Sequence, residues 1–259
     1  MTPGASGLAL EPMAPRAYFA ASRQPRYSLT FAAPLLLLYE GLTTFLPSGA
    51  LSGVRNGADV LLRTLFVALG GRRGVSGFGL VVFAAGAWAV WRDRKRHPGP
   101  LKGGVLLAML AESMVYAALF GFVVSMLTAA LLDHTALAAV PGGAQDPLPL
   151  AAQLVVSLGA GIYEELLFRM LLVSGLLALG MLLGWRRSIA LAVAVVSSAL
   201  IFSGFHYLGP LGDDFSLPSF TFRAIAGLLL TGLYAARGFG IAAWTHALYD
   251  IGLSLLGRF

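Results

Sequence analysis

The stretch "GIYEELLFR", residues 161–169, decides the fold because it places charged side chains inside a long apolar run. Glu164, Glu165 and Arg169 follow "AAQLVVSLGA" and precede "MLLVSGLLALGMLLG". A charge at the centre of a bilayer costs about 2.5–3.5 kcal/mol on insertion scales. A chain that keeps three ionisable residues in such a segment is therefore expected to bury them in a polar site within a membrane protein.

The composition also indicates an integral membrane protein. The chain is 58% hydrophobic and 12% charged, about half the charged fraction of a typical soluble domain. It contains no cysteine, which excludes disulfides and a cysteine nucleophile. The net charge of +6 does not predict nucleic-acid binding, because the basic residues interrupt apolar runs as topology signals do.

The apolar runs predict an all-α, polytopic membrane helix bundle of about seven to eight transmembrane helices. Residues 58–69, "ADVLLRTLFVAL", form the eighth candidate, in which Asp59 and Arg63 are four residues apart, as in a paired interfacial helix. The seven longer stretches are about 28–47, 75–91, 104–132, 149–181, 187–206, 219–236 and 238–257.

The distribution of lysine and arginine predicts a cytoplasmic N-terminus. The linker "RDRKRHPGPLK", residues 92–102, is the strongest positive-inside marker, and the loops 133–148 and 207–218 contain no Lys or Arg. Arg55 and Arg63 conflict with this orientation because they fall on the predicted outer side. A further span near residues 58–69 would invert the N-terminus.

The first ionisable pattern separates two neighbouring glutamates. Glu165 and Arg169 share an α-helical face at a spacing that favours an ion pair, so we interpret them as structural support. Glu164 is expected to point about 100° away from Glu165. An unpaired carboxylate in apolar surroundings suits a general base, so Glu164 is the candidate catalytic residue.

Two further patterns place histidines on other helices. "FSGFHY" sets Phe202 and His206 four residues apart, and a lone histidine at a helix end more often packs than catalyses. "HALYD" sets His246 and Asp250 four residues apart inside the last span. That pair is compatible with a structural hydrogen bond, an oriented catalytic imidazole or half of a metal site.

The order and spacing of the three patterns are more specific than any one of them. Glu-Glu-x-x-x-Arg, then Phe-x-x-x-His, then His-x-x-x-Asn or Asp resembles the CAAX protease and bacteriocin-processing family (CPBP, also called Abi), over residues of about 150–257. The stretch "GLLLTGLYAARGFGIAAWTHALYD" is similar to the last characteristic block of that family. The resemblance implies an intramembrane peptidase whose eukaryotic relatives cleave prenylated tails.

The resemblance also implies a role for each motif residue. Glu164 would activate water with help from His206, Arg169 would be structural, and His246 with Asp250 would steady the oxyanion. The prenyl-protein peptidases of the family have Asn where this chain has Asp250. An ionised Asp would repel an oxyanion, so Asp250 must hold a proton, orient His246 or bind a cation.

On this basis the chain is expected to divide into a cytoplasmic N-terminal tail (1–27), an N-terminal transmembrane region (28–148) and a catalytic transmembrane core (149–259). The expected partners are the lipid bilayer and a membrane-associated peptide or protein substrate, without assuming a prenyl group and without nucleic acid. The expected location is a prokaryotic inner (plasma) membrane. No cofactor is predicted. Zinc is left open, because two histidines and two carboxylates are enough ligands.

Two other classes of function remain open from the sequence. One is a non-catalytic membrane scaffold or a bacteriocin-immunity-type protein. The other is a proton-coupled transporter, which is less favoured because we see no repeated halves with broken helices. Two further membrane carboxylates, Glu40 and Glu112, lie outside the motifs. We expect them to pack or hydrogen-bond within the bundle, and either could line a cavity.

Overall fold

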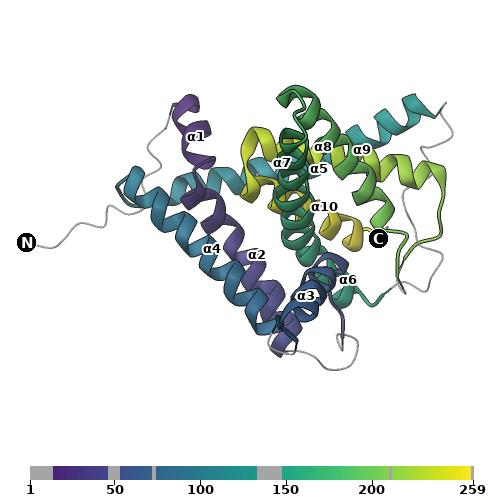
Figure 1. Ribbon diagram of the computed structural model, residues 1–259, viewed down its shortest axis with the longest axis horizontal. Helices are drawn as coiled ribbons and strands as arrows, with labels where there is room; N and C mark the ends of the chain where they lie inside the picture. Colours follow the sequence, from purple (N-terminus) through teal and green to yellow (C-terminus); the bar gives the residue numbers. More distant parts are fainter. Residues whose placement is uncertain (1–13, 46–52, 72–73, 133–147, 210–211, 258–259) are drawn as a thin grey trace, which may run out of the picture.

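The computed structural model describes residues 14–45, 53–71, 74–132, 148–209 and 212–257, and in these ranges every regular element is a helix (Figure 1). The predicted all-α fold is confirmed. In chain order the helices are α1 (Pro15–Ser22), α2 (Pro25–Phe45), α3 (Gly57–Gly70), α4 (Gly74–Arg96), α5 (Gly103–Leu131), α6 (Leu150–Gly159), the π-helical segment η4 (Ala160–Leu172), α7 (Val173–Leu182), α8 (Arg187–Phe205), α9 (Leu217–Arg237) and α10 (Phe239–Leu255).

Five helices of the described part are long and apolar enough to cross a membrane. They are Pro25–Phe45, Gly103–Leu131, Leu150–Leu182, Arg187–Phe205 and Leu217–Arg237. The predicted count of seven to eight transmembrane helices is therefore not confirmed. α4 and α10, which the sequence predicted as spans, are helices but are not among the five. With 17 residues, α10 is only about 25 Å long, which is less than the thickness of a bilayer core.

The outer surface of the bundle is apolar, as contact with lipid requires. Large hydrophobic side chains are exposed on several helices, including Leu80, Phe83, Leu107, Phe122 and Leu182. Exposed apolar surface on this scale is rare in soluble monomers. Together with the five long helices, it indicates an integral membrane protein.

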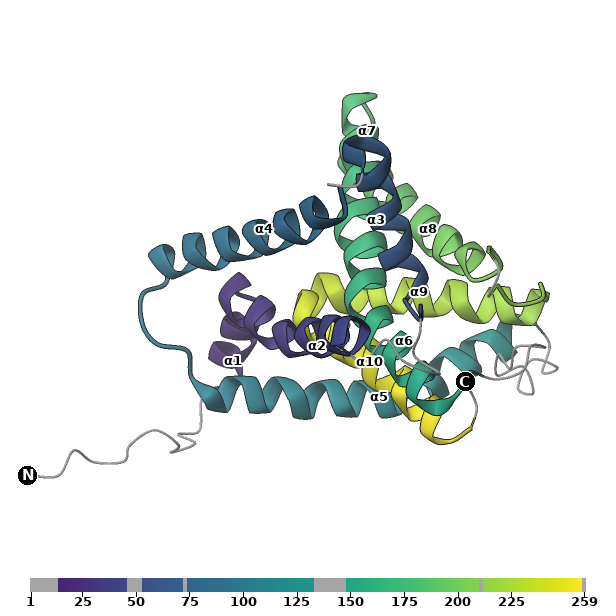
Figure 2. The same ribbon diagram turned by 90° about the horizontal axis from the view of Figure 1, so that it is seen from below.

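The short helix α10 lies in the middle of the bundle, in contact with α2, α5, α6, η4 and α9 (Figure 2). Its sequence suits that place, because Ile241, Ala242, Ala243 and Ala247 are fully buried and most of these side chains are small. Close approach of neighbouring helices follows from small side chains at the contact. The helix that carries His246 is thus enclosed by protein.

Residues predicted as a cytoplasmic tail include a packed helix. α1 and the first turn of α2 fall within residues 1–27, and Ser22, Arg26 and Tyr27 are buried. The Tyr18 hydroxyl donates to Glu112. Burial, and then the adjacent carboxylate, raise the pKa of Tyr18, so this hydroxyl stays protonated. Residues 14–27 therefore pack against the bundle, and residues 1–13 lie outside the described part.

The extra membrane carboxylates are both hydrogen-bonded. Arg237 Nε lies 2.6 Å from Glu112 Oε1, and Arg63 Nη2 lies 2.6 Å from Glu40 Oε1. The predicted pair in α3 also forms, with Arg63 Nε 2.5 Å from Asp59 Oδ1. The orientation of the chain in the bilayer stays a prediction, and residues 133–147 of one outer loop used for it lie outside the described part.

Candidate active site

The candidate site forms where η4 meets α10. A side chain at Gly161 would bring its Cβ within 2.5 Å of the Ala243 carbonyl oxygen and 2.7 Å of the Ala247 Cβ. Both distances are too short for any residue but glycine, so Gly161 permits the contact between the two helices. Since His246 directly precedes Ala247, this contact sets its imidazole beside the two glutamates that follow Gly161.

The π-helical geometry of η4 changes which side chains share a face. A π-helix has more residues per turn than an α-helix, and such segments often occur at functional sites. Successive side chains therefore point in more similar directions than the 100° step of an α-helix allows. Glu164 and Glu165 are both buried and both reach His246. Arg169 pairs with Glu165, as the sequence predicted, and His246 is a neighbour that the two glutamates share.

The imidazole of His246 is surrounded by carboxylates. Its Nδ1 lies 2.7 Å from Glu165 Oε1. Its Nε2 lies 3.9 Å from Glu164 Oε2 and 3.6 Å from Asp250 Oδ2. Because η4 contacts both α8 and α10, the helices around 149–181, 187–206 and 238–257 meet here, as the cost of burying charge leads one to expect. One water could bridge Glu164 and His246.

Glu165 has a second role that the sequence did not predict. Arg169 Nη1 lies 3.2 Å from Glu165 Oε1, so the predicted ion pair forms. The same oxygen accepts from His246, and this bond fixes the orientation of the ring. The sequence also made Asp250 a candidate for orienting His246. Asp250 Oδ2 lies 3.6 Å from the other ring nitrogen, Nε2. Glu165 therefore connects the structural pair to the candidate catalytic histidine.

Arg169 is held by packing as much as by charge. Its guanidinium carbon lies 4.3 Å from the centre of the Phe202 ring, a cation–π contact. None of its nitrogens is aligned for a hydrogen bond with the described residues, although Glu165 is within ion-pair distance. The separation of 3.2 Å between Arg169 Nη1 and Glu165 Oε1 is enough for an ion pair, because the attraction between two buried charges depends little on angle. Phe202 supports the site, as predicted.

His206 reaches the site from the end of α8. Its Nδ1 lies 2.9 Å from the Phe202 carbonyl oxygen, which can only accept. The proton of a neutral ring therefore sits on Nδ1, and Nε2 is free to accept from water. The Phe202 ring packs against both histidine rings, at 4.9 Å from His206 and 6.1 Å from His246. When protonated, His206 would also attract the Glu164 carboxylate.

One further contact comes from the N-terminal half of the chain. Asn56 Nδ2 donates to Glu164 Oε1 over 2.8 Å, so the prediction that Glu164 is unpaired is wrong. The sequence offered only a weak signal, the "NGAD" that caps and opens α3. Nothing in one sequence indicates that a loop 108 residues earlier reaches Glu164.

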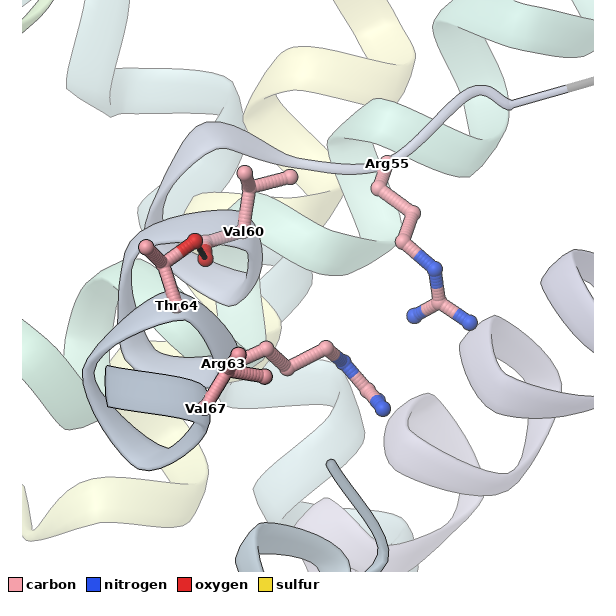
Figure 3. A pocket seen from close by; sticks show the side chains of 5 residues that line it. All are labelled: Arg55, Val60, Arg63, Thr64 and Val67. Atoms are coloured by element: carbon pink, nitrogen blue, oxygen red, sulfur yellow. Dashed lines mark hydrogen bonds between the residues drawn. The ribbon is translucent and has the colours of Figure 1, made fainter. Parts of the chain in front are cut away.

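A hollow of ≈ 280 Å³ lies against α3 and is lined by Arg55, Val60, Arg63, Thr64 and Val67 (Figure 3). Both arginine side chains extend towards α2, where they pair with Glu40. None of the predicted site residues lines this hollow, so it is a separate feature of the surface.

The geometry of the site does not favour a bound metal ion. In the part of the chain that the structure describes, no group of three or more His, Asp or Glu side chains is arranged to hold a metal ion. His246 Nδ1 is occupied by Glu165, and Glu164 Oε1 by Asn56.

Residues 146–252 match the family described as type II CAAX prenyl endopeptidase Rce1-like. Over this segment the chain is similar to the CAAX protease family. The match contains all three motifs, from Glu164 to Arg169, from Phe202 to His206, and from His246 to Asp250, so the predicted resemblance is confirmed. At the level of the CAAX protease family it supports an intramembrane protease, which is a hydrolase. Searches of curated proteins and of solved structures found no match.

Proposed function

We propose that this protein is an intramembrane endopeptidase in which Glu164 activates water for hydrolysis of a peptide bond. The observation that carries the proposal is the environment of Glu164. Its Oε2 is buried, has no hydrogen-bond partner among the described residues, and lies 3.9 Å from His246 Nε2. Its other oxygen is held by Asn56. One oxygen of a fixed, buried carboxylate is thus free to take a proton from water.

The remaining steps use the other motif residues. As Glu164 removes the proton, the water oxygen bonds to the carbonyl carbon of the substrate and the carbonyl oxygen becomes an oxyanion. His206 Nε2 can orient the water. His246 donates from Nδ1 to Glu165, so in its doubly protonated form it can also donate from Nε2 to the oxyanion. The carbon–nitrogen bond then breaks, and the proton held by Glu164 passes to the leaving amine. The products are a new carboxylate and a free amine.

We infer that the substrate is a membrane-associated peptide or protein, and we do not assume that it carries a prenyl group. The site is enclosed by helices of an integral membrane protein, so a substrate held in the bilayer reaches it most directly. Neither metal nor cofactor takes part in this proposal. A prokaryotic plasma membrane and a cytoplasmic N-terminus belong to the same proposal.

The function can be tested with purified protein in liposomes. The probes are a farnesylated peptide ending in a CAAX sequence, the same peptide without the farnesyl group, and an apolar membrane-spanning peptide. We expect cleavage of at least one probe at a single bond, identified by mass spectrometry. Absence of cleavage for all three, with a folded protein, would favour the scaffold alternative.

Asp250→Asn is expected to retain activity or raise it. An asparagine can donate to the oxyanion, and it removes one of the three carboxylates around His246. The check is the cleavage rate of wild type and variant, with and without a chelator, beside elemental analysis. If Asp250 ligates zinc instead, the wild type will contain stoichiometric zinc, and the variant will lose metal and activity by about 10- to 100-fold.

A further inference from the structure

We propose that Asn56 is a positioning residue that holds the Glu164 carboxylate for water activation. It comes from the start of α3, outside the segment that matches the CAAX protease family. Its Nδ2 lies 2.8 Å from Glu164 Oε1, and the two residues are only 2% and 6% exposed. The inference rests on the proposed function and adds to it a residue of the N-terminal half.

The orientation of the Asn56 amide is fixed by its second contact. Asn56 is the N-cap of α3, and its Oδ1 accepts from the backbone N–H of Ala58 over 2.9 Å. A cap requires an acceptor at that position. The amide nitrogen must therefore point the other way, towards Glu164. The hydrogen-bond network thus determines which end of the amide meets the carboxylate.

A chain of hydrogen bonds fixes the backbone of Asn56 as well. Its N–H donates to the Tyr39 hydroxyl over 3.0 Å, and that hydroxyl donates to Asp59 Oδ2 over 2.8 Å. Asp59 is in turn paired with Arg55 and Arg63, at 2.6 and 2.5 Å. Asn56 therefore approaches Glu164 from a rigid support that joins α2 to α3.

Gly159 allows this support to reach the site. A Cβ at Gly159 would lie 2.6 Å from the Cβ of Asn56 and 2.6 Å from Cε2 of Tyr39. Any side chain there would push both residues away from the helix that carries Glu164. Gly159 precedes Glu164 by five residues, about one helical turn. The absence of a side chain at Gly159 therefore leaves room for the Asn56 amide to reach Glu164.

Asparagine suits this position better than the other capping residues. Ser, Thr and Asp can accept the cap hydrogen bond, but only Asn also carries an N–H donor at the far end of the group. A donor directed at a carboxylate stabilises its ionised form. It also limits rotation of the side chain, so that Oε2 remains turned towards His246. A general base needs both conditions before it can accept a proton.

The test uses the full-length protein in detergent and the apolar reagent dicyclohexylcarbodiimide, which labels protonated carboxyl groups in membrane proteins. Mass spectrometry follows the ratio of labelled to unlabelled peptide that contains Glu164. Asn56→Ser keeps the cap but loses the donor. We expect it to raise this ratio on the order of 10-fold, as for loss of a hydrogen bond to a charged group.

Two further variants separate this role from folding. Asn56→Asp has the same size, keeps the cap and replaces the donor by a second carboxylate oxygen, so Glu164 labelling should again rise. Ser216→Ala removes only a cap of α9, where Ser216 Oγ accepts from Ser219 N over 3.3 Å, and should leave Glu164 labelling unchanged. An unchanged ratio in both Asn56 variants would overturn the proposal.

Kinetics provide the second readout for the peptide probes that the wild type cleaves. Asn56→Ser should lower kcat by roughly 10- to 100-fold with KM unchanged, because the amide acts on the base and not on the substrate. A higher KM with unchanged kcat would contradict the positioning role. If the wild type cleaves no probe, the proposed function fails, while the labelling ratio still decides whether Asn56 holds Glu164.

Discussion

Glu164→Gln is expected to abolish peptide hydrolysis and to leave the protein folded. Glutamine has the same shape and can still pair with Asn56 after its amide rotates, but it cannot accept a proton from water. Loss of a general base typically costs roughly 10²- to 10⁴-fold in rate. The measurement is kcat/KM for a cleaved peptide, beside the thermal unfolding midpoint of each protein in detergent.

Glu112→Gln is the matched control for this change. Glu112 is also a carboxylate of a membrane-spanning helix, and its contacts with Tyr18 and Arg237 lie apart from the motif residues. We expect the activity of the folded control protein to remain close to that of the wild type. Equal activity loss in both variants would contradict a specific role for Glu164, and so would a fully active Glu164→Gln protein.

Arg169→Ala is expected to be the most destabilising single change in the site. Arg169 and Glu165 are 1% and 0% exposed, so removing the arginine leaves the buried Glu165 carboxylate with His246 as its remaining partner. Breaking a buried ion pair in this way costs about 3–5 kcal/mol. The space beneath the Phe202 ring is emptied as well. The expected result is low expression or a clearly lower unfolding midpoint.

A double variant tests the cause of this loss. Arg169→Met keeps most of the side-chain volume, and combining it with Glu165→Gln removes the uncompensated charge. We expect the double variant to unfold at a higher temperature than Arg169→Met alone. If both proteins are equally unstable, packing and not charge explains the effect. The double variant is expected to be inactive, because His246 loses its carboxylate partner.

The helices and the convergence of the motifs could be predicted from the sequence. Long apolar runs require helices in a bilayer because every backbone polar group must be satisfied internally. Three separate apolar runs carry ionisable residues, and exposing such residues to lipid costs free energy. The helices are therefore expected to turn these residues towards one another, and they meet around His246. The ion pair of Glu165 with Arg169 follows from simple helical spacing.

The geometry around Glu164 could not be predicted in the same way. The prediction used α-helical spacing, whereas η4 is π-helical. Glu164 and Glu165 both reach His246. Asn56 is distant in the chain, and its approach depends on the missing side chain of Gly159. Such contacts result from tertiary packing, which a periodic pattern does not contain.

The N-terminal segment shows a related limit. Residues 14–27 contain arginines among Pro and Ala and were predicted as part of a tail, yet Ser22 and Arg26 are buried. Arg26 Nη1 donates to the His97 carbonyl oxygen over 2.6 Å. The carbonyl groups that accept from this arginine belong to His97 and Gly99, in a distant linker, and the sequence does not indicate this contact.

The most direct test of water activation by Glu164 is a single turnover in H₂¹⁸O, followed by mass spectrometry of the peptide product and of the protein. The account predicts one ¹⁸O atom in the new carboxylate of the product, no ¹⁸O in the peptide that contains Glu164, and no product with Glu164→Gln. Label in Glu164 would indicate that its carboxylate attacks the substrate. Product formed by Glu164→Gln at the wild-type rate would contradict the account altogether.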